Sequence, residues 1–93
     1  MDKQEIFNGV QDICRDIFDI DDLIISDNTT ADDIDEWDSL NHINLLSVIE
    51  KEFKIKFPLG ASEELKNIGD MINMIEDRID QWYFTTLELQ QKI

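Results

Sequence analysis

Four side chains near the middle of the chain have types and spacing that could support nucleophilic chemistry. Ser39 and His42 are three residues apart, so they share a face if this segment is helical. Asp35 or Asp38 could then act as the third, orienting group. The G-x-S-x-G context of a serine nucleophile is missing, because neither neighbour of Ser39 is glycine. We therefore interpret His42, the only histidine, as an exposed helical side chain and predict that the protein is not an enzyme.

The acidic stretch before Ser39 resembles a calcium-binding loop only in composition. An EF-hand loop needs glycine at its sixth position and glutamate at its twelfth. Loops that start at Asp19 or at Asp33 have other residues at both positions. The sequence therefore predicts a solvated acidic surface and no metal site.

Ser39 lies where this acidic stretch gives way to a helical pattern, and that place has two interpretations. Serine and aspartate are among the best residues for satisfying the backbone N–H groups at a helix N-terminus. The same N–H groups and the helix dipole also stabilise a phosphodiester. We expect Ser39 to cap the helix, and an exposed serine there could also accept a modification made by another enzyme.

The charge of the chain excludes some partners. The chain has 8 basic and 22 acidic side chains, which gives a net charge of −14. Nucleic acids and anionic membranes both require clustered Lys and Arg, so we predict neither as a partner. The charge instead favours steered encounters with proteins that carry basic patches.

Length and cysteine content indicate a simple organisation. A chain of 93 residues predicts one small domain, which we expect to be a monomer. Cys14 is the only cysteine, so neither an intrachain disulfide nor a cysteine-based metal site is expected. The first residues are too polar for a signal peptide, and no apolar run approaches the roughly 20 residues of a membrane span. We therefore expect a cytoplasmic protein.

Apolar residues at helical spacing predict three long helices, over residues 3–18, 39–53 and 68–83. A capped single turn is predicted at residues 62–65, with Ser62 as its cap. The expected fold class is all-α, a small four-helix bundle of three long helices and one short turn. The residues expected on the apolar stripes are Ile6, Val10, Ile13, Cys14, Ile17, Leu40, Ile43, Leu45, Leu46, Val48, Ile49, Phe53, Ile68, Met71, Ile72, Ile75, Ile79 and Trp82.

The connections between these helices differ in length. Residues 19–38 form one long connection, which is unusual in a small domain and often functional. Asn67 resembles the N-cap of the last helix, with Asp70 three residues further on. The apolar residues expected to hold the long connection against the bundle are Ile20, Leu23, Ile24 and Ile34.

Two separated segments resemble one known family. "DEWDSLNHINLLSVIEKEFKIKF" is similar to the acyl carrier protein family around its phosphopantetheine-bearing serine, and "LKNIGDMINMIEDRI" resembles the last helix of that family. The order of elements also matches. The resemblance predicts an acyl carrier domain over residues 1–83. Residues 84–93 would be a C-terminal extension that either continues the last helix, which we favour, or is disordered.

The resemblance implies a function and a set of site residues. A phosphopantetheinyl transferase would attach 4′-phosphopantetheine from coenzyme A to Ser39, and the thiol of this cofactor would carry acyl groups as thioesters. Asp38 matches the acidic residue that the transferase recognises, and Leu40 matches the apolar position after the serine. The helix that begins at Ser39, including His42 and Ile43, would be the docking surface for acyl-loading and acyl-processing enzymes.

One departure from the family pattern concerns the pathway. Carriers of dissociated fatty-acid synthases usually have a strongly acidic docking helix, whereas Asn41 and Asn44 are neutral here and Lys51 adds a positive charge. The "EWDSL" segment also lacks the glycine pair typical of peptidyl carriers. We therefore expect a role in polyketide or another specialised acyl pathway. The alternatives are dissociated fatty-acid synthesis and an acidic adaptor protein that is never modified.

Overall fold

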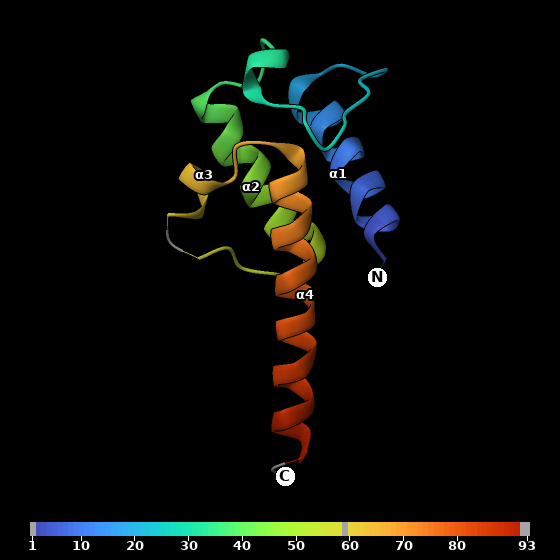
Figure 1. Ribbon diagram of the computed structural model, residues 1–93, viewed down its shortest axis with the longest axis vertical. Coiled ribbons are helices and arrows are strands. Elements are labelled where there is room, and N and C mark those ends of the chain that lie inside the picture. The colour runs from blue at the N-terminus through green and yellow to red at the C-terminus, as the bar shows by residue number, and fades with distance from the viewer. Residues whose placement is uncertain (1, 59, 92–93) are drawn as a thin grey trace.

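The computed structural model describes the backbone of residues 2–58 and 60–91, and the side chains of residues 2–58 and 60–79. Over these residues the chain forms four α-helices and a short 3-10 helix (Figure 1). The elements are α1 (Lys3–Phe18), η1 (Ala31–Asp33), α2 (Ser39–Phe53), α3 (Ala61–Glu64) and α4 (Ile68–Gln91). The predicted all-α bundle, with three long helices and one short one, is confirmed.

The last helix continues past the predicted end of the domain. In Figure 1 the C-terminal part of α4 extends well beyond the other helices. Its bounds, Ile68–Gln91, agree with the helix continuation that we favoured after residue 83. The division between a carrier domain and an extension stays a prediction. The predicted core position of Trp82 lies outside the residues whose side chains are described.

One apolar core joins α1, α2 and α4, because α1 packs against both of the other helices and the buried apolar residues of all three form one cluster. The residues that are almost completely buried are half of the predicted stripe positions. They are Ile6, Val10, Cys14, Leu45, Ile49, Ile68, Met71, Ile72 and Ile75. No helix among the described residues is long and apolar enough to cross a membrane.

The predicted stripe on α2 is wrong at three positions. Leu40 is 69% exposed, Ile43 is 59% exposed and Val48 is 39% exposed. Residues spaced three apart do not stay on one face of an α-helix, because each step rotates them by about 60° relative to the previous one. Ile43 consequently lies about 160° around the helix from the buried Leu45. The result is an apolar strip that faces away from the core.

The long connection is held by side chains of α1. Arg15 Nε donates to the Leu23 carbonyl oxygen at 2.8 Å, and the Ile25 N–H donates to Gln11 Oε1 at 3.0 Å. These bonds set the register so that Ile25, 3% exposed, enters the core. Ile24 was predicted to hold the connection but is 75% exposed. Ile34 is buried, as predicted.

The start of α4 is anchored to the long connection. The Ile68 N–H donates to the Thr29 carbonyl at 3.0 Å, and the Gly69 N–H donates to the Asp27 carbonyl at 2.9 Å. Asn67 Oδ1 accepts from the Asp70 N–H at 2.7 Å, which confirms the predicted N-cap. Two backbone hydrogen bonds therefore tie the long connection to the first turn of α4.

The predicted cap of α3 is wrong. The helix begins at Ala61, and its N-cap is Gly60, with φ 84° and no side-chain hydrogen bond. Ser62 is already inside the helix, so its hydroxyl is not placed to cap it. This four-residue helix therefore lacks the side-chain cap that begins α1 and α2.

The C-cap of α2 stores a small backbone strain. Lys54 adopts φ 57° and ψ 48°, a left-handed conformation that costs an L-residue roughly 1–2 kcal/mol. We expect Lys54→Gly to raise the free energy of unfolding by about 0.5–1 kcal/mol, as measured by urea titration. Lys51→Gly, inside the same helix, is the matched control and should lower stability by about 1 kcal/mol. Equal effects of the two substitutions would contradict the assignment.

Candidate functional site

Asp38, rather than Ser39, caps α2. Asp38 has an extended backbone, with φ −98° and ψ −177°, and its Oδ1 accepts from the Asn41 N–H at 2.8 Å. The Asp38 carbonyl accepts the first helical bond, from the His42 N–H at 2.8 Å. Our prediction that Ser39 is the cap is therefore wrong. An N-cap needs non-helical backbone, and Ser39 is already the first helical residue.

Because Asp38 is the cap, the Ser39 hydroxyl has no capping role. Its side chain is exposed and makes no hydrogen bond to any residue that the structure describes. Within the same part of the chain, the backbone N–H groups of Ser39 and Leu40 have no acceptor either. An exposed hydroxyl therefore lies beside two open donors at the positive end of a helix dipole.

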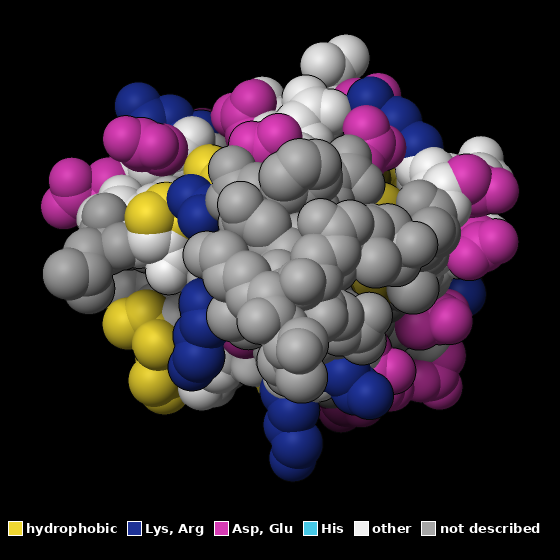
Figure 2. Space-filling view, turned by 90° about the horizontal axis from the view of Figure 1, so that it is seen from below, with side chains coloured by type: hydrophobic (Ala, Val, Ile, Leu, Met, Phe, Trp, Pro, Cys, Tyr) yellow, Lys and Arg dark blue, Asp and Glu magenta, His cyan; other side chains and the backbone are white. Residues whose placement is uncertain are grey.

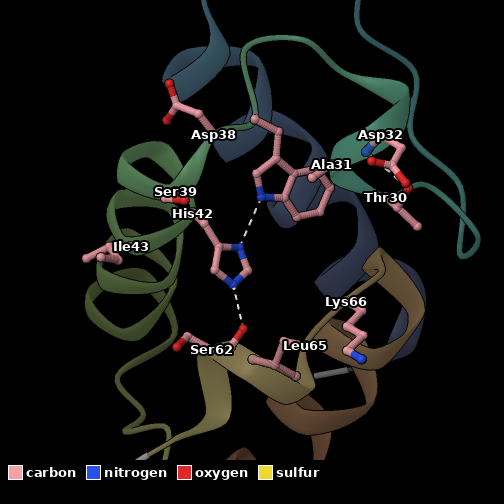
Figure 3. Close-up of a pocket in the computed structure, with 11 residues that line it drawn as sticks. Thr30, Ala31, Asp32, Asp38, Ser39, His42, Ile43, Ser62, Leu65 and Lys66 are labelled. Carbon is pink, nitrogen blue, oxygen red and sulfur yellow. Dashed lines mark hydrogen bonds between the residues drawn. The ribbon is translucent and has the colours of Figure 1, made fainter.

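Ser39 lies on the rim of an open groove of about 780 Å³ (Figure 3). The groove lies between η1, the start of α2 and the α3 segment, so it is built by parts of the chain that are distant in sequence. The residues that line it are Thr30, Ala31, Asp32, Trp37, Asp38, Ser39, His42, Ile43, Ser62, Leu65 and Lys66.

His42 turns into this groove instead of into solvent. Its Nδ1 accepts from Trp37 Nε1–H at 3.0 Å, and its Nε2 lies 2.9 Å from the Ser62 carbonyl oxygen. Both ring nitrogens are thus engaged away from Ser39, and the structure shows no Ser–His dyad among the described residues. Our interpretation of His42 as an exposed side chain is corrected, because it is half-buried between α2 and α3.

Trp37 is a site residue that the sequence analysis missed. Its side chain is 4% exposed and packs on Phe18 with ring centroids 5.8 Å apart. A large aromatic residue in an otherwise acidic connection was the available signal, since such a side chain must bury its ring. Trp37 thereby fixes the two residues that follow it, Asp38 and Ser39, relative to the end of α1.

Comparison with known proteins places the chain in a family. A family model described as "Phosphopantetheine attachment site" matches residues 8–75. The chain belongs to the acyl carrier protein family. The acyl carrier protein of Lactobacillus acidophilus is 32% identical over 77 residues, which cover 82% of this chain and 95% of that protein. The one from Borreliella burgdorferi is 34% identical over 79 residues, which cover 84% of this chain and 98% of that protein.

The fold comparison agrees with the sequence comparison. The solution NMR structure of a holo acyl carrier protein from Geobacter metallireducens superposes with a TM-score of 0.78 and 37% identity. The match covers 84% of this chain and 90% of that chain. The protein is therefore an acyl carrier with a 4′-phosphopantetheine prosthetic group, and it is not an enzyme. Its family implies interaction with a transferase and with acyl-processing enzymes.

The start of α2 suits a carrier's prosthetic group. A phosphodiester needs an accessible hydroxyl and benefits from N–H donors, and Ser39 and Leu40 offer both. The group, when bound, supplies a terminal thiol that holds acyl groups as thioesters. The protein's own thiol cannot take this part. Cys14 is buried, and desolvation raises the pKa of its thiol to about 12, so it stays protonated at neutral pH.

The four partner-binding residues predicted for this carrier do not all lie on the groove, because Asp38, His42 and Ile43 line it and Leu40 does not. Asp38 is exposed at the N-terminal end of α2, and the side chains of Leu40 and Ile43 are exposed along this helix. His42 faces the groove and bonds within the molecule. The described residues contain no group of three or more His, Cys, Asp or Glu side chains placed to hold a metal ion.

The cap role of Asp38 can be separated from its charge. Asp38→Ala removes the acceptor for the Asn41 N–H, so we expect the free energy of unfolding to fall by about 1 kcal/mol. Asp38→Asn keeps an acceptor oxygen, so its free energy of unfolding should fall by no more than a few tenths of a kcal/mol. Urea titration measures both, with Asp35→Ala on the exposed loop as the control. A loss as large in Asp38→Asn as in Asp38→Ala would contradict the cap.

Proposed function

We propose that Ser39 is the residue that bears 4′-phosphopantetheine. The observation that carries this proposal is its exposed hydroxyl at the first position of α2, where Asp38 already does the capping. A phosphodiester then forms at Ser39 Oγ while the phosphoanhydride bond of coenzyme A breaks. The transferase takes the hydroxyl proton, and the nucleotide half of coenzyme A leaves. Attachment of phosphopantetheine at Ser39 therefore breaks no hydrogen bond that stabilises α2.

Intact-mass measurement tests this proposal. The protein is incubated with coenzyme A and a broad-specificity phosphopantetheinyl transferase, and we expect a mass gain of one phosphopantetheine per chain. The same incubation without transferase is the control. A chain that gains no mass would contradict the proposal and leave the unmodified acidic adaptor as the better description.

We further propose that partner enzymes dock on the outer face of α2 mainly through apolar contacts. Leu40 and Ile43 are well exposed there, and Asn44 and Ser47 beside them are exposed and uncharged. The acidic Glu50 of α2 makes an intramolecular hydrogen bond, in which its Oε2 accepts from the Phe57 N–H at 2.8 Å. Such a face favours a partner with an apolar recess over one with an arginine cluster.

The two ends of α2 differ in charge. Asp35, Glu36 and Asp38 are exposed near Ser39, whereas at the other end the exposed Lys51 and Lys54 accompany one exposed acid, Glu52. Lys and Arg side chains are also visible on the face of the molecule seen along α4 from its C-terminal end (Figure 2). Partners therefore need basic groups only near Ser39. This pattern supports a polyketide or other specialised acyl pathway over dissociated fatty-acid synthesis.

Ile43 offers a direct test of the apolar docking face. Ile43→Asp should raise the KM of the transferase by about tenfold, because an exposed side chain that becomes buried on docking contributes at least about 1 kcal/mol. Ile24→Asp is the matched control, since Ile24 is 75% exposed and lies in the long connection, outside the groove. We expect it to leave KM unchanged. Equal effects of the two variants would contradict a docking face on α2.

A further inference from the structure

Three segments of the chain meet at the His42 imidazole. Trp37 comes from the long connection, His42 from α2 and Ser62 from α3, and the two ring nitrogens of His42 are each hydrogen-bonded to one of the others (Figure 3). The Trp37 and His42 rings are also stacked, with centroids 6.0 Å apart and an interplanar angle of 26°. The imidazole therefore bridges the two walls of the groove that Ser39 borders.

Only one state of the imidazole satisfies both bonds. An indole N–H can only donate, so His42 Nδ1 must carry no proton. A backbone carbonyl can only accept, so Nε2 must carry the proton that points to Ser62. Protonation of Nδ1 would set two N–H donors against each other. The bridge therefore requires a neutral ring protonated at Nε2.

The α3 segment has few other attachments. It is four residues long, its N-cap Gly60 makes no side-chain bond, and it packs on the bundle through Ala61 and Leu65. The hydrogen bond from His42 to the Ser62 carbonyl adds a polar contact between α2 and α3 to this apolar packing. Trp37, at 4% exposure, depends on the same ring to satisfy its buried N–H.

We propose that His42 is a positioning residue that latches α3 onto α2 and so sets the opening of the groove beside Ser39. The neutral ring holds the latch closed, and a charged ring releases the Trp37 N–H. The effect on a bound acyl group rests on the proposed function of Ser39, whereas the latch itself does not. The charged groups that line the same groove are Asp32 of η1, Asp38 before α2 and Lys66 after α3.

NMR spectroscopy of the full chain without the prosthetic group tests the latch apart from any loading. We expect the His42 nitrogen shifts at neutral pH to report an unprotonated Nδ1 and a protonated Nε2. On acidification, the Trp37 indole N–H signal and the amides of residues 62–65 should shift with the same midpoint as the His42 ring. The proposal would be overturned by a His42 ring that is protonated at Nδ1 at neutral pH. It would also be overturned if the amide signals of residues 62–65 did not change as the His42 ring is protonated.

Substitutions at His42 give the second measurement. In His42→Ala, the Trp37 indole and the amides of residues 62–65 should exchange with solvent about tenfold faster, as expected for loss of one buried hydrogen bond. His42→Gln can still donate toward the Ser62 carbonyl, so it should restore protection of α3 but abolish the pH response. Asp32, Asp38 and Lys66 remain in both variants, so a response that disappears belongs to His42.

A matched variant and an independent readout complete the test. Glu52→Gln, at an exposed position near the other end of the same helix, should behave like the wild type. If His42→Ala does not fold, the comparison of His42→Gln with the wild type decides, and an unchanged pH response there would overturn the latch. Mass gain on loading is measured separately, so failure of the latch and failure of Ser39 as the attachment residue give different results.

Discussion

Ser39→Ala is expected to abolish attachment of phosphopantetheine and to change the free energy of unfolding by less than about 0.5 kcal/mol. The substitution removes the hydroxyl that would bear the phosphodiester. It leaves the fold intact because Asp38 makes the capping bond to Asn41, and the exposed Ser39 side chain makes none among the described residues. Intact mass after incubation with transferase and coenzyme A measures the first effect, and urea titration measures the second.

A thiol assay gives the same prediction a second readout. Cys14 is the only cysteine of the chain, and burial raises the pKa of its thiol to about 12. A thiol reagent at neutral pH should therefore label the native unloaded protein hardly at all, and it should label one thiol per chain after loading. Ser39→Ala should stay unlabelled, and Glu52→Gln, at an exposed position near the other end of α2, should behave like the wild type. An equal mass gain in Ser39→Ala and the wild type would exclude Ser39 as the attachment residue.

Trp37→Ala should have the largest effect on stability of the substitutions considered. The side chain is 4% exposed, packs on Phe18 and donates to His42, so its removal leaves a cavity under the segment that leads into α2. We expect the free energy of unfolding to fall by about 3–5 kcal/mol. A domain of this size is stable by only about 5–15 kcal/mol, so the variant should be close to unfolding. Urea titration measures the loss.

Two further substitutions separate the causes of that loss. Trp37→Phe keeps most of the ring packing and removes only the N–H donor, so we expect a smaller loss of about 1 kcal/mol for the hydrogen bond plus a packing term. Leu40→Ala, at a side chain 69% exposed, should change stability by less than about 0.5 kcal/mol. A Trp37→Ala variant as stable as Leu40→Ala would show that the indole does not anchor this segment.

The bounds of the helices were accessible from sequence because they depend on local signals. The predicted helices over residues 3–18 and 39–53 coincide with α1 and α2, and the Asn67 cap of α4 was found in the same way. Periodicity, capping residues and helix-breaking residues act within a few positions of each other. The place of Ser39 at the start of α2 follows from these signals.

Side-chain orientation was less accessible, because it depends on which neighbour lies opposite. Hydrogen bonds between α1 and the long connection bury Ile25 instead of Ile24: the Ile25 N–H donates to Gln11, 14 residues earlier, and Arg15 donates to Leu23, 8 residues later. On α2, spacing alone suggested that Leu40 and Ile43 face the core. The position of α1 against α2 instead selects the face that carries Leu45 and Ile49.

By itself, the sequence determined that this is a small acidic all-α protein whose "DSL" segment opens a helix and resembles that of acyl carriers. These properties depend on local spacing and on motifs, which need no knowledge of distant contacts. Only the tertiary structure decided that Asp38 takes the capping bond and leaves Ser39 open, and that His42 turns inward to join Trp37 and Ser62. The first assignment depends on the extended backbone dihedral angles of Asp38, and the second depends on a contact across 20 residues of chain, which forms only when the bundle packs.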